Sequence, residues 1–253
     1  MKGHVKSKSS GGDQIIQEHV PFASSKQVWD QAARWLVLIG GVINPIAFVL
    51  VYTVAGILRP GYSQIHQAIS DLGVGPNGSL LDAIAVIHAL LLIAFAVGFA
   101  LSMQQVLTLR WCLSSAALLV LPELALVTAA IFTDAPSTVA IHSLATIVGL
   151  VSTISAFIVI GLGLRRDPQW RGWGTYSLVT AVVTLVLVAV MFWVFTPGTP
   201  LATVKLGGLM ERLVSVETLA WYVVIGWRLF VLAGSRQQDQ GQATPVKTME
   251  QQR

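Results

Sequence analysis

Six long apolar runs, separated by short polar segments, dominate this sequence. They occupy residues 35–58, 80–103, 111–132, 139–164, 175–195 and 213–232. A helix needs about 20 apolar residues to cross a hydrocarbon core about 30 Å thick, and every run reaches that length. None of the runs alternates polar and apolar residues with the period of two that membrane β-barrels show. The pattern therefore predicts an all-α, polytopic membrane protein with six transmembrane helices.

The composition of the chain fits a membrane domain with polar ends. Hydrophobic residues make up 54% of the sequence and charged residues 11%, whereas a typical soluble domain has about 25% charged residues. The polar ends predict a disordered cytoplasmic arm at 1–30 and a disordered cytoplasmic tail at 234–253, with the six-helix membrane domain at 31–233. Cys112 is the only cysteine, which excludes an internal disulfide and a thiolate metal cluster.

Lysine and arginine residues fall mainly on one side of the predicted bundle. Of the 16 such residues, only Arg59, Lys205 and Arg212 lie in the first and fifth connections between the runs, and the third connection has none. The positive-inside rule therefore predicts that both termini are cytoplasmic and that the protein is a multi-pass protein of the cytoplasmic (inner) membrane. An anionic inner leaflet also accounts for the net charge of +4. We expect membrane lipids as partners and no nucleic acid.

The first connection is long and carries residue types that bind ligands. Arg59, Tyr62, Ser70 and Asp71 stand there among glycines and prolines. Long connections in compact domains are commonly functional, so these four residues are candidates for ligand binding.

Three further candidates, Asp134, Glu211 and Arg212, lie in the other connections on the same side. The first connection has the length and the glycines to fold back over the bundle. Because charges left buried and unpaired are costly, we expect Arg59 or Arg212 to form ion pairs there with Asp71, Asp134 or Glu211.

Ionisable residues inside the apolar runs are the remaining candidates. His88, Glu123, His142 and Glu217 all lie within runs, where a charged group costs about 2.5 to 3.5 kcal/mol. We expect Glu123 to be protonated and hydrogen-bonded to another helix. Eleven residues separate it from Asp134, so a continuous helix would place both on one face.

Two other patterns concern the helices themselves. Two prolines inside the apolar runs, Pro45 after Asn44 and Pro122, predict that the helices there are broken. Residues at helical spacing in the fourth run form a small, polar stripe that suits an inward-facing or helix-packing surface: His142, Thr146, Gly149 and Thr153.

Three motifs in order along the chain carry a family resemblance. They are Arg59-Pro60-Gly61-Tyr62-Ser63 with Ile69-Ser70-Asp71-Leu72-Gly73, Phe132-Thr133-Asp134 with His142, and Gly208-Leu209-Met210-Glu211-Arg212-Leu213 with Trp221 and Arg228. Over about residues 35–232 the chain resembles the bacterial and archaeal membrane family catalogued as domain of unknown function 998. The resemblance implies a six-helix membrane fold and no established activity.

The function that these residues favour is binding of an outer-leaflet lipid or small molecule in an outward-facing polar cavity. The sequence assigns no catalytic residue, cofactor or oligomeric state, and we expect no metal site. One alternative is a membrane-embedded hydrolase acting on a lipid-linked substrate, with His142 or His88 as base and Asp134, Asp71 or Glu123 as its carboxylate partner.

Three other classes stay open. A proton-coupled carrier would use Glu123 and Glu217 as titrating sites. A sensor or assembly subunit would recognise its ligand with the first connection. A haem protein would use His88 and His142 as axial ligands.

Overall fold

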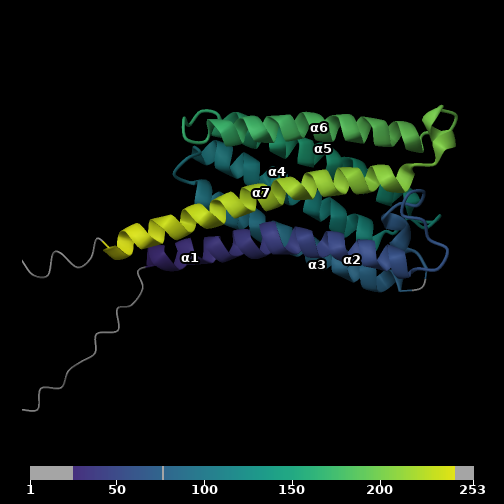
Figure 1. The fold of residues 1–253 in the computed structure, drawn as a ribbon, viewed down its shortest axis with the longest axis horizontal. Coiled ribbons are helices and arrows are strands. Elements are labelled where there is room, and N and C mark those ends of the chain that lie inside the picture. The colour runs from purple at the N-terminus through teal and green to yellow at the C-terminus, as the bar shows by residue number, and fades with distance from the viewer. Residues whose placement is uncertain (1–24, 76, 243–253) are drawn as a thin grey trace, which may run out of the picture.

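The computed structural model describes residues 25–75 and 77–242, and this part of the chain is all-helical (Figure 1). Pro76 and the ends 1–24 and 243–253 lie outside the described residues. The α-helices are α1 (Ser25–Leu38), α2 (Asn44–Leu58), α3 (Gly78–Met103), α4 (Leu109–Ile131), α5 (Val139–Leu164), α6 (Arg171–Phe195) and α7 (Gly207–Gln242). Three short helices join them: the π-helix η1 (Ile39–Ile43) and the 3-10 helices η2 (Ser70–Gly73) and η3 (Leu201–Val204).

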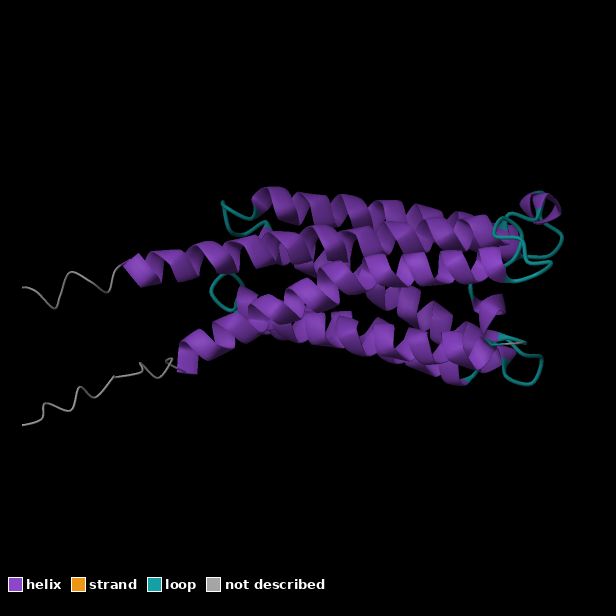
Figure 2. Cartoon of the chain, turned by 60° about the horizontal axis from the view of Figure 1, so that its bottom comes forward, coloured by secondary structure: helices purple, strands orange, loops and turns teal. Residues whose placement is uncertain are grey.

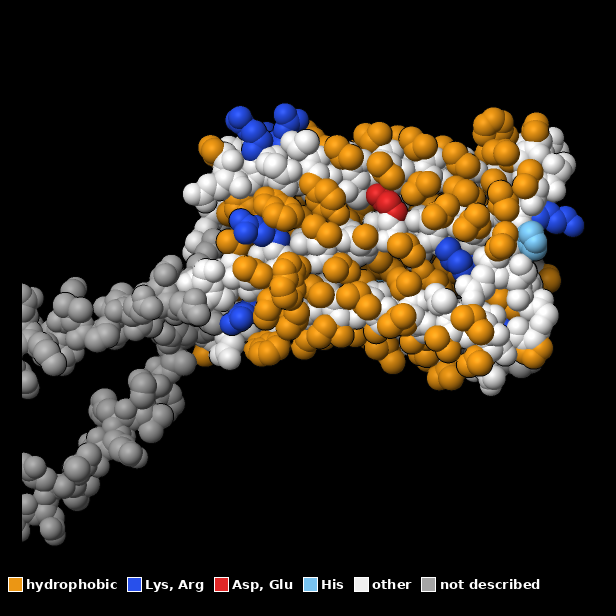
Figure 3. Space-filling view, in the orientation of Figure 1, with side chains coloured by type: hydrophobic (Ala, Val, Ile, Leu, Met, Phe, Trp, Pro, Cys, Tyr) orange, Lys and Arg blue, Asp and Glu red, His pale blue; other side chains and the backbone are white. Residues whose placement is uncertain are grey.

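Six helical segments in the described residues are long and apolar enough to cross a membrane, which confirms the predicted spans. The first is the continuous segment Val28–Leu58, formed by α1, η1 and α2, and the last is Gly207–Ser235 within α7. The other four are α3, α4, α5 and α6. Hydrophobic side chains cover the length of the bundle (Figure 3), as a surface in contact with lipid requires.

The first and last helices extend into segments that the sequence led us to expect as disordered. α1 begins at Ser25 and α7 ends at Gln242, so residues 25–30 and 234–242 are helical. Both stretches contain helix-forming Gln with Lys or Arg and have no proline, so the helices continue past the apolar runs. The expectation of disorder at 1–24 and 243–253 concerns residues outside the described part of the chain.

The bundle has two distinct ends. α1 begins and α7 ends at one of them, which we call the termini end (Figures 1 and 2). The described parts of three connections lie at the opposite end, which we call the connector end: 59–75 with Asn77, 132–138 and 196–206. Residues 59–75 and Asn77 are the connector. The candidate residues of the connections therefore share one end of the molecule, as predicted.

An aromatic core fills the middle of the bundle. Trp221 of α7 is fully buried, and its ring centroid lies 4.5 Å from that of Phe157 and 6.4 Å from that of Phe95. Its Nε1 donates a hydrogen bond to Ser177 Oγ at 3.0 Å, which satisfies the buried indole. Tyr222 packs edge-on against Phe95. This core ties α3, α5, α6 and α7 together.

The two prolines expected to break helices have different effects. The Asn44 N–H bonds Ile39 O five residues back, and Pro45, which has no N–H, follows this π-turn. The irregularity predicted there is therefore a π-helix inside a continuous span. The break predicted at Pro122 is wrong, because α4 continues through this buried proline, as transmembrane helices can when neighbouring helices hold them.

Candidate functional site

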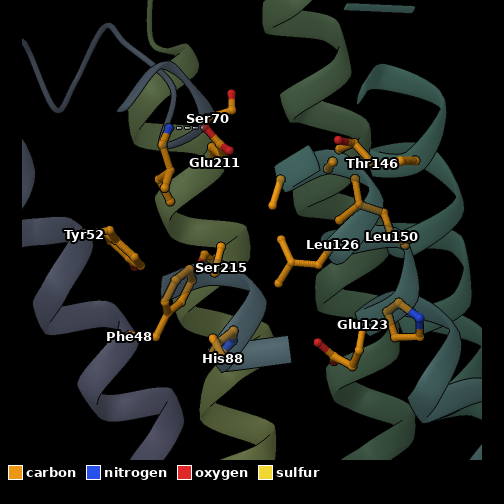
Figure 4. A pocket seen from close by; sticks show the side chains of 18 of the residues that line it. Phe48, Tyr52, Ser70, His88, Glu123, Leu126, Thr146, Leu150, Glu211 and Ser215 are labelled. Carbon is orange, nitrogen blue, oxygen red and sulfur yellow. Dashed lines mark hydrogen bonds between the residues drawn. The ribbon is translucent and has the colours of Figure 1, made fainter. Parts of the chain in front are cut away.

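A cavity of about 290 Å³ lies in the half of the bundle nearer the connector end, and we call it the central cavity. Its walls come from the helices α2 to α7, with α6 contributing Met191, and η2 of the connector covers it. Figure 4 shows Phe48, Tyr52 and Ser215 on one side of this space and Leu126 and Leu150 on the other. Most of the lining is apolar, which suits a ligand with a hydrocarbon part.

Half of the ligand-binding candidates predicted from the sequence line the central cavity. The residues that line it are Ser70, His88, Glu123, His142 and Glu211. Those that do not are Arg59, Tyr62, Asp71, Asp134 and Arg212. The polar stripe of α5 lines the cavity along its whole length, which confirms the inward orientation predicted for it.

A cluster of four residues holds the connector against α7, and we call it the latch. Its members are Tyr62, Gln67, Ala68 and Arg212. Arg212 Nη2 donates to Tyr62 Oη at 2.7 Å, and Tyr62 Oη donates to Ala68 O at 2.5 Å. Arg212 Nη1 also donates to Gln67 O at 3.0 Å. Burial raises the pKa of Tyr62 above its ordinary value of 10.0, so the phenol keeps its proton and can serve as donor and acceptor at neutral pH.

Arg59 holds the connector from the other side, at the end of α2. Its two terminal nitrogens donate to Asp71 O and Val74 O, both at 2.7 Å. The Asp71 carboxylate itself accepts from the backbone N–H of Ala68 at 2.9 Å. The ion pairs predicted for Arg59 and Arg212 are therefore wrong. An irregular connector leaves many backbone carbonyls without helical partners, and the guanidinium groups bind those carbonyls instead.

Glu211, near the start of α7, binds the connector just before η2, the 3-10 helix that we call the cover of the cavity. Its Oε2 accepts a hydrogen bond from Ile69 N at 2.5 Å (Figure 4), and nearby Leu209 N donates to Ile65 O at 2.9 Å. At Gly208 a Cβ would collide with the backbone at Gln67, so glycine is needed for this close approach. The carboxyl group of Glu211 thus lies at the cavity wall and also fixes the cover.

Glu123 and Asp134 do not lie on one continuous helix. Glu123 is 4% exposed, and its Oε1 accepts a hydrogen bond from Tyr222 Oη at 3.2 Å. This bond confirms the expected contact with another helix, whereas the protonation of Glu123 stays a prediction. α4 ends at Ile131, so Asp134 lies in the following connection and the shared helical face predicted for the two acids does not exist. Glu217 lies outside the cavity and accepts from Thr184 Oγ1 at 2.7 Å.

His88 is fixed by α2 at the cavity wall. Its Nδ1 lies 3.0 Å from Asn44 Oδ1, while Asn44 Nδ2 donates to His88 O at 3.1 Å. Because the Asn44 amide nitrogen is already a donor to this carbonyl, Nδ1 carries the hydrogen and Nε2 is left as an acceptor. The ring of Phe48 stacks on the imidazole with centroids 4.0 Å apart.

His142 is oriented in a similar way by the end of α4. Its Nδ1 lies 3.0 Å from Ala129 O and 3.1 Å from Phe132 O, so Nδ1 donates and Nε2 is again an acceptor. Asp82 of α3 also lines the cavity and interacts electrostatically with His142. Sequence reasoning did not select Asp82, although an acid just inside an apolar run was a usable signal.

Tyr52 is a second cavity residue that sequence reasoning missed. It is 2% exposed, and its hydroxyl lies beside Ser215 without a hydrogen bond of standard geometry. Figure 4 shows its side chain reaching toward the space between α2 and α7. A buried hydroxyl without a good partner is costly, so this group is well placed to bind a ligand.

Acidic side chains and two histidines line the cavity. Among the described residues of its lining there is no lysine or arginine. Among the residues that the structure describes, no group of three or more His, Cys, Asp or Glu side chains is placed to hold a metal ion. The site therefore offers hydrogen-bond acceptors, hydroxyl groups and apolar walls.

Comparison with known proteins gives one match. The family model described as "Protein of unknown function (DUF998)" matches residues 42–228, a range that contains the whole lining of the central cavity. No curated protein and no solved structure matches the chain.

Proposed function

Since this chain belongs to the family described as "Protein of unknown function (DUF998)", we propose its function from its own geometry: it binds a lipid or another small amphiphile of the outer leaflet in the central cavity. The chain is an integral membrane protein, and this cavity is the observation that carries the proposal. Apolar walls suit a hydrocarbon chain, and the polar groups near the connector suit a small head group.

The charge of the lining narrows the class of ligand. Glu123, Glu211 and Asp82 line the cavity without a lysine or arginine beside them in the lining. An anionic head group would meet carboxyl groups in a lining that has no lysine or arginine among its described residues, which opposes its binding. A neutral or cationic head group with hydrogen-bond donors fits this set, since Nε2 of His88 and of His142 are acceptors.

A photoreactive probe tests the binding proposal. We expect a long-chain alcohol that carries a diazirine to label the peptides containing Leu126 and Leu150 in proteoliposomes, because both side chains line the cavity. Unlabelled alcohol should compete, and the fatty acid of equal length should compete less well. Labelling that the alcohol does not reduce would contradict specific binding.

A substitution inside the cavity provides the matched comparison. Leu126→Trp should lower the labelling of the Leu150 peptide about tenfold, because about 1.4 kcal/mol of overpacking opposes the ligand. Leu124→Trp, on the membrane-facing side of the same helix, should leave that labelling unchanged. Mass spectrometry of the labelled peptides measures both. Equal labelling in the two variants would show that the probe lies elsewhere.

The orientation of the protein is part of the same proposal. Basic side chains gather at the termini end of the face seen in Figure 3, which supports a cytoplasmic location for that end and an inner-membrane location for the protein. We therefore expect an impermeant thiol reagent to label Ser137→Cys from outside intact cells and not Gln169→Cys. Both positions are exposed, and the native Cys112 is buried. The reverse labelling pattern would place the cavity on the cytoplasmic side.

One observation supports a second candidate function. Glu123 is buried at the middle of a membrane span and lines the cavity, which suits a carrier that moves its ligand together with a proton. The hydrolase alternative has less support, because His142 donates to carbonyl oxygens and not to a carboxylate that could orient it as a base.

A further inference from the structure

A second hollow, which we call the α2–α3 groove, lies on the membrane-facing side of the bundle. It measures about 220 Å³, and its walls are almost entirely apolar. Ile43 of η1 and Ile87 of α3 line it and are about half exposed. Within a membrane span such side chains contact hydrocarbon, so the groove opens toward the lipid.

The π-helix explains why a groove forms at this place. Gly40 and Gly41 lie so close to Leu91 and Phe95 that a Cβ on either glycine would collide with α3. This contact holds the first span tightly against α3 at η1. Past Pro45, α2 packs less extensively on α3 than α1 and η1 do. The space between α2 and α3 is the result.

The groove and the central cavity are separated by one pair of side chains. Phe48 and His88 line both hollows, and their stacked rings, 4.0 Å apart and 12° from parallel, form the shared wall. Asn44 holds the imidazole in place from the groove side. The phenyl ring has no such hydrogen bond, so its rotation is the smallest movement that would join the two spaces.

We infer that the α2–α3 groove is a lateral entrance through which the hydrocarbon chain of an uncharged membrane amphiphile reaches the central cavity, with Phe48 as the gate. This inference rests on the binding function proposed above. The polar groups of the groove wall, the side chains of Asn44 and His88, are already bonded to each other. The groove therefore favours a hydrocarbon chain over a polar group.

The connector end offers a less favourable route. Opening the cover would break the bond from Ile69 N to Glu211 and those of Arg212 to Tyr62 and Gln67. Rotation of Phe48 breaks no hydrogen bond and gives up only its ring contacts with His88 and Tyr52. A ligand already dissolved in the membrane also reaches the groove without crossing the polar surface.

The time course of photolabelling tests this route. Proteoliposomes are mixed with vesicles that contain the diazirine alcohol, and labelling of the Leu126 and Leu150 peptides is followed until it is constant. Ile87→Trp should lower the initial rate about tenfold and leave the final extent as in wild type, because it fills the entrance and not the cavity. Leu90→Trp is the matched control: Leu90 is also on α3 and also 57% exposed, like Ile87, but it lines neither hollow.

Removing the gate provides a change in the opposite direction. Phe48→Ala should raise the rate of labelling and the rate of probe release together by severalfold. Equal rates in wild type, Ile87→Trp and Phe48→Ala, with the cavity still labelled at equilibrium, would overturn the lateral entrance while leaving the binding function intact. Absence of competable cavity labelling in wild type at equilibrium would instead overturn both.

Discussion

Replacing Arg212 with methionine is expected to release the connector from α7. The guanidinium group donates to Gln67 O, Gly208 O and Tyr62 Oη at 2.7 to 3.0 Å. Hydrogen bonds from a charged donor contribute more than neutral ones, and their loss leaves partly buried oxygens without partners. We expect the free energy of opening the connector to fall by about 3 kcal/mol, which is about a hundredfold in hydrogen exchange.

Hydrogen–deuterium exchange measures this effect where it occurs. Exchange in peptides covering residues 62–74 should accelerate, while the aromatic core around Trp221 should keep its protection. Arg110→Met, an exposed arginine near the start of α4, is the control and should change neither region. Tyr62→Phe should reproduce part of the effect, because it removes the phenol that Arg212 and Ala68 share. Unchanged protection of the connector in Arg212→Met would rule out the latch.

The spans could be predicted from the sequence because the signal is local. A run of apolar residues long enough to cross the membrane has few alternatives in lipid, so the pattern alone indicates a helix. The prediction also placed the candidate connections on one side, since the helices alternate in direction. The exact bounds differed at 25–30 and 234–242 because polar helix formers continue a helix without any apolar signal.

The partners of the arginines could not be predicted in the same way. Arg59 and Arg212 bind carbonyl oxygens, and every residue has a carbonyl group, so the sequence contains no mark of which ones are free. Carboxylates are visible in a sequence, which made ion pairs the natural hypothesis. The structure instead uses Glu211 and Asp71 as acceptors for backbone N–H groups of the connector.

The cavity shows a similar division. His88, Glu123 and His142 were found because ionisable residues inside apolar runs are rare and costly. Tyr52 escaped notice because a tyrosine in a membrane helix is ordinary until its neighbours in space are known. The helix face that Asp134 was expected to share with Glu123 depended on a continuous α4, but the helix ends three residues before Asp134.

Glu123 separates the two candidate functions. The hydroxyl of Tyr222, itself almost fully buried, donates to its Oε1. Glu123→Gln retains an acceptor oxygen of the same shape, so the free energy of unfolding should change by less than about 0.5 kcal/mol. Glu123→Leu leaves the Tyr222 hydroxyl buried without a partner and should cost about 1 to 3 kcal/mol. The double variant Glu123→Leu with Tyr222→Phe should recover most of that loss, because both polar groups are gone.

Function should respond to these variants differently from stability. If the protein is a proton-coupled carrier, Glu123→Gln should abolish flux driven by a pH gradient, because the amide cannot exchange a proton, while labelling by the uncharged diazirine alcohol stays within about twofold of wild type. If the protein only binds its ligand, wild type should show no flux driven by a pH gradient, and Glu123→Gln should keep the labelling of wild type. Flux assays in proteoliposomes with an imposed pH gradient, run beside the labelling assay, distinguish the two. Gradient-driven flux that persists in Glu123→Gln and in Glu123→Leu would exclude Glu123 as the coupling residue.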